Sequence, residues 1–345
     1  MPLCNDSSRN HAVAVALLFT GALYIFFSTR SNSDTISTHL QNINIPQPVV
    51  NIKFPQEELG AVLESAAAGN NNTVIIALVN RAYVEEVGEG RTMLDLFLGS
   101  FWEGEGTIPL LDHLLLVATD QTAYDRCRFR KLHCYKMDTK GVDLAGEKVF
   151  MSAGFIEMMW RRTHFLLDVL RRGYHILFTD TDVLWLRNPF SRLSNNGSLD
   201  MQISVDSNNV EAGHLINTGF FHVRSNNKTI SLFHKWYDMR LNSPGVKEQD
   251  VLQKLLATGF FDQLGLNVAF LNTTQFSGFC EDSPDMGAVT TVHANCCRHI
   301  PAKVFDLTLV LSDWKSYKAS HVNDKWSPHH KCGSSWKDNH YVPKT

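Results

Sequence analysis

The stretch from Tyr174 to Phe190 constrains the fold more than any other part of the chain. Its first half is a short apolar run rich in β-forming residues. Gly173 precedes the run and Asn188-Pro189 bounds it later, so chain-breaking residues stand on both sides. This pattern predicts a buried central strand.

Two acids, Asp180 and Asp182, directly follow this strand. In an extended chain, residues two apart point the same way and lie roughly 7 Å apart at Cα, so both carboxylates can face one hard cation. Because acids are costly inside a sheet, we expect both to lie where the strand leaves it. Ligands of open α/β sheets bind at that carboxyl end. The stretch therefore predicts a ligand or cation site.

Length and charge limit the class of protein. The chain has 345 residues, 44% hydrophobic and 19% charged, which is enough for one large domain or two. The formal net charge of −3 shows no excess of positive charge of the kind that binds nucleic acid. The sequence has no internal repeat and no long low-complexity tract.

An uncharged stretch near the start of the chain predicts a membrane anchor. Ala12–Phe27 holds sixteen residues without a charge between Arg9 and Arg30. A helix of that length spans about 24 Å, and Ser28 and Thr29 extend it. A cleaved signal peptide and a buried core helix are the alternatives. The lack of a small-x-small cleavage site and the N-terminal position favour an uncleaved signal anchor.

The anchor divides the sequence into four parts. Residues 1–11 are predicted to be a cytosolic tail and 12–29 the transmembrane helix. Residues 30–72, which are polar with Ser, Asn, Gln and Pro, are predicted to be a stem with one short helix at 57–68. Residues 73–345 then form a luminal domain.

Two further features are compatible with a lumen. Four Asn-x-Ser/Thr sequons follow the anchor, at Asn71, Asn196, Asn227 and Asn272. Six of the seven cysteines also follow it, namely Cys127, Cys134, Cys280, Cys296, Cys297 and Cys332. In an oxidising compartment these allow up to three disulfides in fifteen connectivities. Cys127 and Cys134 are the preferred pair, and free buried cysteines are the alternative.

The order of the predicted elements indicates one mixed α/β domain. Thr73–Val79 reads as a buried strand, and a helix over 91–101 leads to a second apolar strand over 113–118. The clearest helix is 152–172, because its apolar residues form one stripe between a capping Ser152 and Gly173. Later strands are expected at 200–205, 215–224, 268–271 and 289–293, and later helices at 229–241, 248–258 and 302–317.

The two acids admit two catalytic interpretations. In one, they hold Mn²⁺ or Mg²⁺, and the metal binds the diphosphate of a nucleotide sugar. In the other, Asp180 is the phosphorylated residue of a haloacid-dehalogenase-type phosphatase. That motif has Thr or Val where this chain has Leu184, and it normally follows the first strand of its domain. A solvated turn, the non-catalytic alternative, is disfavoured by the buried strand before the acids.

Several motifs together resemble those of the plant nucleotide-diphospho-sugar transferases. They are Gly173–Phe190, Asn217–Arg224, Glu248–Asp250 and His293, and the resemblance extends over residues 73–320. The group is glycosyltransferase family 77, which includes rhamnogalacturonan II xylosyltransferases and extensin arabinosyltransferases. The motifs are specific together, and only the first is specific alone.

The resemblance implies a GT-A fold, in which a Rossmann-type mixed sheet is flanked by helices. It also implies a divalent metal, type II topology in the Golgi membrane with a luminal catalytic domain, and retention of the anomeric configuration. The expected partners are a UDP-sugar donor, a glycan or glycoprotein acceptor and the membrane, and no nucleic acid.

Carried over residue by residue, the resemblance makes Asp182 the main metal ligand and places Asp180 beside the metal or the nucleotide ribose. A late His often completes the metal ligands, and His293 fits, with His321 as its rival. An imidazole beside two carboxylates suits Mn²⁺. Related members tend to read His-Asn-Asn-Trp, whereas this chain reads His-Ala-Asn-Cys-Cys from His293. The residues that contact the acceptor are therefore left open.

Three further charged residues have a functional and a structural interpretation. Arg161 or Arg162, on the helix before the acidic strand, could clamp the diphosphate, or both could lie on a solvated face. Asp250 belongs to a Glu-Gln-Asp that resembles the family's Asp-Gln-Asp. It is expected to bind the donor sugar or stabilise an oxocarbenium-like transition state. A purely structural carboxylate at a helix start is the alternative.

Polar groups after other strands complete the predicted site. Asn217, Thr218 and Gly219 are expected to offer amide and backbone contacts to a sugar. The uridine side is expected where the first two strands end, at Val79, Asn80 and Asp120.

The sequence therefore predicts a metal-dependent glycosyltransferase. It would move a pentose or galactose from a UDP-sugar to a cell-wall glycan or glycoprotein. Asp180, Asp182 and His293 would hold Mn²⁺, and Asp250 and Asn217 would act at the reacting sugar. Attack on the front face, assisted by the leaving phosphate, is the expected mechanism. A luminal phosphatase and a non-catalytic carbohydrate-binding protein are the alternatives.

Overall fold

The computed structural model describes residues 55–67, 71–87, 90–208, 214–320, 325–338 and 341–343. They belong to one compact unit, Phe54–Thr345. The predicted cytosolic tail and anchor lie outside the described residues, and so does most of the predicted stem. Within the described ranges, no helix is long and apolar enough to cross a membrane.

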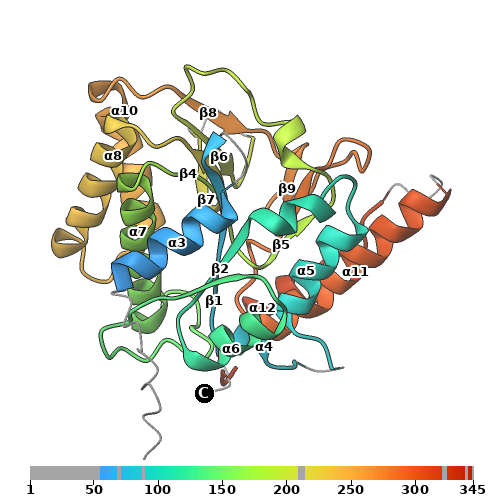
Figure 1. Cartoon of the computed structure of the whole chain (residues 1–345). Helices are drawn as coiled ribbons and strands as arrows, with labels where there is room; N and C mark the ends of the chain where they lie inside the picture. The colour runs from blue at the N-terminus through green and yellow to red at the C-terminus, as the bar shows by residue number, and fades with distance from the viewer. Residues whose placement is uncertain are drawn as a thin grey trace, which may run out of the picture. The chain divides into compact units, whose positions relative to one another are not determined.

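A seven-stranded mixed sheet forms the centre of the unit (Figure 1). Its strands are β1 Thr73–Val79, β2 Leu114–Ala118, β3 His133–Lys136, β4 His175–Thr179, β6 Met201–Val205, β7 Ile216–Val223 and β8 Val268–Leu271. Their spatial order is β3-β2-β1-β4-β7-β6-β8. The first four are parallel, whereas β7 is antiparallel to both β4 and β6. The predicted mixed α/β sheet is confirmed.

A second sheet of three short strands receives the chain after the acids. Its strands are β5 Val183–Trp185, β9 Phe276–Gly278 and β10 Thr291–His293, in the order β5-β10-β9. Only three residues separate the end of β4 from the start of β5, so both acids lie in the passage between the two sheets. β10 is antiparallel to β5, and His293 lies opposite Val183. This pairing brings His293 to the acids.

Helices cover both faces of the central sheet. Figure 1 shows α7 and α8 on one side of the central strands and α5 and α11 on the other. The helices are α3 Pro55–Ala66, α4 Arg81–Val84, α5 Met93–Glu103, α6 Gln121–Phe129, α7 Ala153–Arg171, α8 Asn227–Asp238, α9 Glu248–Ala257, α10 Phe260–Gln263, α11 Ile300–Ser320 and α12 His330–Ser335. Short 3₁₀ segments are η3 Ile108–His113, η4 Pro189–Ser191 and η6 Met239–Asn242.

The two-sided cover explains why the strands read as continuous apolar runs. In β1, Val74 and Ile76 pack in one core cluster with residues of α3 and α7. The alternate residues Ile75 and Ala77 pack in another cluster with α5 and α6. Successive side chains of β1 thus face different layers, and both layers are apolar there.

The helix predicted over 152–172 forms as α7. The Ser152 side chain accepts a hydrogen bond from the backbone N–H of Phe155 and caps its start. Gly173 follows its end with a φ of +86°, a left-handed conformation that favours glycine. α7 therefore delivers the chain into β4 as its sequence pattern indicates.

Two expectations about element boundaries need correction. The helix expected at 57–68 inside the stem is α3, and its Leu59, Leu63 and Ala66 are buried in the same cluster as β1. The folded domain therefore begins before residue 73. The polar residues around α3 made this region resemble a stem, although α3 itself buries an apolar stripe. The strands β3, β5 and β9 were not predicted, since three or four residues carry too little periodicity.

Six cysteines of the described residues form three disulfides. Cys127–Cys134, the preferred pair, is confirmed. The other two are Cys280–Cys296 and Cys297–Cys332, which join the segment after β10 to the end of β9 and to α12. The adjacent cysteines 296 and 297 thus fix the chain just beyond His293 in two directions.

If α3 belongs to the folded domain, then truncating its buried side chain must destabilise the domain. We expect Leu63→Ala, at a fully buried position, to lower the free energy of unfolding by about 2–5 kcal/mol in urea titration. The exposed neighbour Glu64 is the matched control, and Glu64→Ala should change it by less than about 0.5 kcal/mol. Equal stability of the two variants would place α3 outside the cooperative unit.

Candidate active site

Asp180 and Asp182 lie at the end of β4, between the two sheets. The Asp180 backbone N–H donates to the Gly219 carbonyl at 2.7 Å, which continues the β4–β7 ladder by one residue. Asp182 directly precedes β5 and is only 3% exposed. The Asp182 carbonyl accepts from the Ala294 N–H at 3.0 Å. Backbone pairing on both sides therefore fixes the positions of the two acids.

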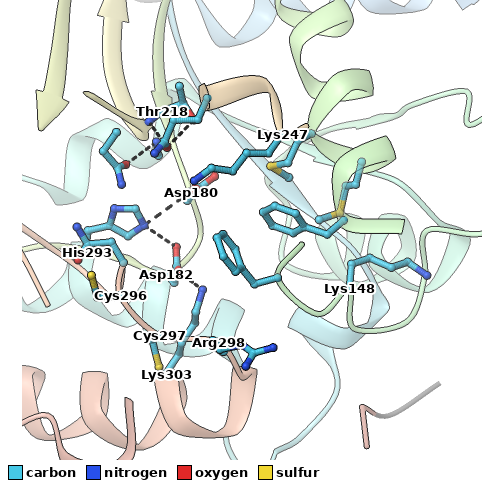
Figure 2. A pocket seen from close by; sticks show the side chains of 18 of the residues that line it. Lys148, Asp180, Asp182, Thr218, Lys247, His293, Cys296, Cys297, Arg298 and Lys303 are labelled. Atoms are coloured by element: carbon cyan, nitrogen blue, oxygen red, sulfur yellow. Dashed lines mark hydrogen bonds and ion pairs between the residues drawn. The ribbon is translucent and has the colours of Figure 1, made fainter. Parts of the chain in front are cut away.

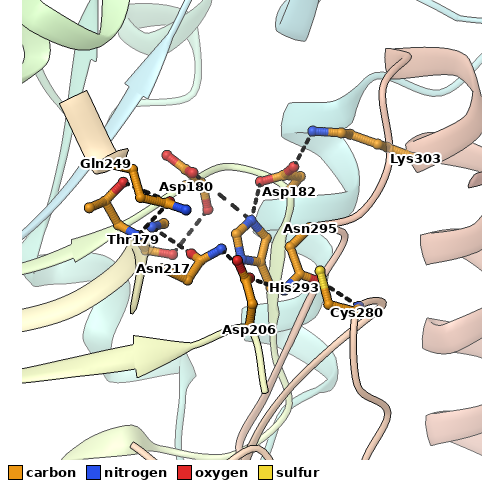
Figure 3. Close-up of polar contacts among 12 residues, drawn as sticks. Thr179, Asp180, Asp182, Asp206, Asn217, Gln249, Cys280, His293, Asn295 and Lys303 are labelled. Carbon is orange, nitrogen blue, oxygen red and sulfur yellow. Dashed lines mark hydrogen bonds and ion pairs between the residues drawn. The ribbon is translucent and has the colours of Figure 1, made fainter. Parts of the chain in front are cut away.

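His293 completes a cluster of three metal-ligating side chains. Its Nε2 lies 3.3 Å from Asp182 Oδ1 and 3.9 Å from Asp180 Oδ2. Figures 2 and 3 show the imidazole facing both carboxylates. One ligand atom from each residue lies within 4.8 Å of the others. Two carboxylates and one imidazole fit Mn²⁺ or Mg²⁺ by donor type, and the identity of the ion is not fixed by them.

Gly219, on β7, makes room for this cluster. A Cβ at this position would lie 2.7 Å from Asp180 Oδ2 and 2.9 Å from Asn217 Oδ1, and it would also clash with His293. No side chain larger than hydrogen fits here without moving the ligands. The Asn-Thr-Gly motif therefore has a steric role at the acids.

A lysine that the sequence did not single out neutralises Asp182. Lys303, on α11, places Nζ 2.6 Å from Asp182 Oδ2. Burial alone would raise the pKa of the Asp182 carboxyl, but the charges of Lys303 and His293 outweigh it and hold the pKa far below its usual range. Burial would lower the pKa of Lys303, and the charge of Asp182 reverses this and raises it. Asp182 and Lys303 are therefore both charged.

The other two members of the cluster respond to the same charges. Burial raises the pKa of Asp180, and the charge of Arg162 opposes that shift. Burial would lower the pKa of His293, yet the charge and hydrogen bond of Asp182 prevail and raise it. The negative charge of Asp182 thus favours a positive charge at the position of the His293 imidazole.

Arg162 holds the other side of Asp180. It is 2% exposed, and its guanidinium donates to Asp180 Oδ1 at 2.9 Å, to Glu248 Oε1 at 2.5 Å and to Thr218 Oγ1 at 3.0 Å. It also lies over the Phe178 ring, 4.7 Å from the centroid. The solvated-face interpretation is therefore wrong for Arg162. Arg161 instead pairs with Glu157 one turn earlier.

A cavity of about 310 Å³ opens beside this cluster. Its volume lies at the lower end of the range for small-molecule sites. Asp206 lines it and accepts hydrogen bonds at 2.8 Å from the side-chain amides of Asn217 and Asn295 (Figure 3). The lining also includes Tyr83, Thr218, Gly219, Glu248, Gln249, Lys303 and the three ligand residues.

A smaller cavity of about 30 Å³ adjoins the same side chains. It is lined by Val79 and Asn80, at the end of β1, and shares Tyr83, Arg162 and Asp180 with the larger cavity. The Oδ1 of Asn80 is buried and has no hydrogen-bond partner in the described part of the chain. An unpartnered buried acceptor at a cavity wall is a position for a ligand donor.

Most predicted site residues meet at these cavities. Asp180, Asp182, His293, Arg162 and Asn217 line the larger one. Val79 and Asn80 line the smaller one.

Asp120 and Asp250 line neither cavity. Asp120 caps α6 by accepting from the Ala123 N–H at 2.9 Å, and it also accepts from the Arg81 N–H. Asp250 has a side chain 51% exposed that pairs with Lys247 at 3.4 Å. Both acids therefore make structural contacts in this fold, and neither is brought to the metal-ligating cluster. The rival metal ligand His321 lies outside the described residues.

Sequence reasoning missed Lys303, Glu248 and Tyr83. Lys303 lies ten positions after His293 on an amphipathic helix where a lysine is ordinary, so only its place beside the late His could have indicated it. Glu248 begins the Glu-Gln-Asp motif, two positions before Asp250. Tyr83 carried no signal beyond its closeness to the end of β1.

A family model described as nucleotide-diphospho-sugar transferase matches residues 109–307, more than half of the chain. The matched range includes both acids, His293 and Lys303, so it covers the candidate site.

Three relatives show how far the similarity extends. An uncharacterized protein of Arabidopsis thaliana is 70% identical over 345 residues, covering 100% of both chains. A second uncharacterized Arabidopsis protein is 38% identical over 289 residues, covering 81% of this chain and 75% of the relative. An Arabidopsis arabinosyltransferase is 25% identical over 202 residues, covering 52% of this chain and 43% of the relative.

The steric role of Gly219 can be tested without any substrate. We expect Gly219→Ala to lower the free energy of unfolding by about 1–3 kcal/mol, because its methyl group would overpack the acid cluster. Gly99→Ala is the matched control, since a Cβ there meets nothing within 4 Å and favours helix α5. If denaturant titration finds Gly219→Ala as stable as the control, then the side chains around Gly219 leave room for a methyl group.

Proposed function

This chain belongs to the nucleotide-diphospho-sugar transferase family and is a glycosyltransferase, and we propose that it is metal-dependent and uses a UDP-sugar donor. The observation that carries the proposal is the group of Asp180, Asp182 and His293 at the wall of a cavity, with the cations Arg162 and Lys303 paired to the two acids. Such a wall matches a ligand that brings a diphosphate and a divalent ion together.

The proposed ion is Mn²⁺ or Mg²⁺, held by Asp180, Asp182 and His293. When bound, such an ion supplies positive charge to the departing diphosphate. Lys303 and Arg162 add two fixed charges at the same wall, and each is already positioned by a carboxylate. Lys303 can donate to a phosphate oxygen, because its Nζ lies at the cavity surface beside Asp182.

The nucleoside is proposed to occupy the end of β1. Tyr83 offers a ring there, and the Oδ1 of Asn80 and the Oγ1 of Thr119 are buried without a hydrogen-bond partner among the described groups. A base and ribose carry the N–H and O–H donors that such acceptors require. Asp120 is not assigned to this side, because backbone N–H groups occupy its carboxylate.

The donor sugar is proposed to lie against Asn217, Glu248 and Gln249. Glu248 is 1% exposed and is fixed by Arg162 and by the Thr218 hydroxyl, 2.8 Å away. Gln249 accepts from the Thr218 N–H at 3.1 Å. We therefore transfer the role first expected of Asp250 to Gln249, with Glu248 and Thr218 as positioning residues.

The mechanism we propose retains the anomeric configuration. The acids near the reacting centre are held in ion pairs, which suits electrostatic stabilisation better than attack on the sugar. The acceptor hydroxyl would approach on the face of the leaving phosphate, whose oxygen takes its proton. The donor sugar we propose is a pentose or galactose, and the relative named as an arabinosyltransferase supports a pentose.

Type II topology in the Golgi membrane is proposed for the whole chain, with a cell-wall glycan or glycoprotein as acceptor. The apolar stretch at 12–29 supports an anchor, and the three disulfides suit an oxidising lumen. The sequon residues are also exposed, as surface glycans require: Asn71, Asn196, Asn227 and Asn272.

Hydrolysis of UDP-sugars tests the function and the role of Asp182 together. We expect Mn²⁺-dependent release of UDP, and Asp182→Asn should lower it roughly 100-fold or more, because the variant loses a charged ligand. The exposed Asp112 provides the control, and Asp112→Asn should retain full turnover. Turnover of phosphomonoesters instead would favour the phosphatase, and no turnover with sugar binding alone would favour a binding protein.

The contribution of His293 is tested by metal titration. We expect His293→Ala to raise the Mn²⁺ concentration needed for half-maximal UDP-sugar hydrolysis roughly tenfold or more, because one of three ligands is lost. An unchanged titration would remove His293 from the metal site and make His321 the candidate ligand.

A further inference from the structure

We propose that the outer part of the main cavity is an acceptor subsite that takes an acidic saccharide, with Lys148 and Arg298 as the cations that bind its carboxylates. The inference rests on the proposed function, since it names the acceptor class for the same transfer. It is independent of which sugar the donor carries.

Three segments far apart in the sequence build this outer wall. We use that name for five side chains of the cavity lining, Lys148, Phe150, Phe155, Arg298 and Trp336. The first two precede α7, and Phe155 lies in its first turn. Arg298 lies between β10 and α11, and Trp336 follows α12. The wall is therefore assembled only in the folded domain.

Aromatic rings give the wall an apolar surface. The centroids of Phe150 and Phe155 are 5.4 Å apart, and those of Phe150 and Trp336 are 5.9 Å apart. Trp336 is 47% exposed although its indole N–H is bonded to the Cys296 carbonyl at 2.7 Å. Partly exposed rings at a cavity mouth suit the C–H face of a sugar ring.

The wall also carries two cations, Lys148 and Arg298. Neither Lys148 nor Arg298 forms an ion pair with a described residue, and the Nε of Arg298 is buried without a hydrogen-bond partner among them. Lys247 lies on the same side, 5.1 Å from the Phe150 ring centroid, but it pairs with Asp250. The Arg298 guanidinium lies 5.7 Å from the Trp336 ring centroid, and an incoming anion would add the carboxylate partner that it lacks among the described residues.

Both carboxylate oxygens of the adjacent acid, Glu147, accept hydrogen bonds from other groups. Its Oε1 accepts from the Ile300 N–H at 2.8 Å, and its Oε2 accepts from the Tyr341 hydroxyl. Burial and the bond to Glu147 raise the pKa of Tyr341. The bond to Ile300 ties the segment before α7 to the start of α11. Glu147 therefore holds the wall together and forms no ion pair with Lys148.

These cations are separate from those that face the acid cluster. Lys303 and Arg162 bond directly to Asp182 and Asp180, where we place the donor diphosphate. In Figure 2, Lys148 and Arg298 lie to the right of the two acids, away from His293. Lys148 and Arg298 are therefore available to bind the acceptor. A carboxylate suits them, because guanidinium and ammonium groups both donate to it strongly.

A matched pair of acceptors tests the inference with the full chain. The pair is an oligosaccharide of a uronic acid and its neutral counterpart, in which each carboxylate is reduced to the alcohol. With the UDP-sugar that is hydrolysed fastest, we expect kcat/KM to be roughly tenfold or more higher for the acidic acceptor. Equal or better transfer to the neutral acceptor would overturn the inference.

Variants of the two cations locate the effect. Lys148→Gln and Arg298→Gln should each lower the ratio of acidic to neutral transfer, and the double variant should bring it close to one. Lys254→Gln, at an exposed position of α9 outside the cavity lining, should keep the wild-type ratio. Because the ratio compares two acceptors on one protein, partial unfolding cannot imitate the loss. An unchanged ratio in the double variant would contradict the assignment.

The two proposals fail in different ways. If no UDP-sugar is hydrolysed or transferred, then the proposed function is wrong and the acceptor assignment is wrong with it. If UDP-sugar is hydrolysed and transferred without preference for the acidic acceptor, then only the acceptor assignment is wrong.

Discussion

The charge balance around Asp180 and Asp182 is the constraint on which the rest of the structure depends. Buried carboxylates are costly unless cations and hydrogen bonds compensate them, and here the cations come from three separate elements. Arg162 lies on α7, His293 on β10 and Lys303 on α11. The acids thus require that α7 packs on the central sheet, that the small sheet forms, and that α11 closes against it. The same contacts therefore stabilise the fold and build the candidate site.

The parts of this arrangement that the sequence predicts are those with strong local patterns. The strands β1 and β8 have their predicted bounds, and α7 shows its cap and its terminating glycine in the sequence. Asp180 and Asp182 could be found because a buried strand ends in them. Lys303 could not, because its partner lies 121 residues away and one lysine among the polar residues of an amphipathic helix carries no special signal.

The choice of Asp250 over Glu248 shows a different limit. Residues two apart in a helix point about 200° from each other, so only one of these two acids can face a site. The motif names both, and the packing of α9 decides: the Trp236 indole N–H bonds to the Glu248 carbonyl at 2.7 Å, and Glu248 turns inward to Arg162. Such a choice depends on tertiary contacts that no local pattern contains.

The central claim is that one cluster binds the metal and the diphosphate together. The most direct measurement is a crystal structure with Mn²⁺ and UDP, in which anomalous scattering locates the metal. The account predicts a single strong peak within coordination distance of Asp182 and His293, with a phosphate oxygen beside Lys303. A metal peak elsewhere, or UDP bound with no metal at this cluster in saturating Mn²⁺, would contradict it.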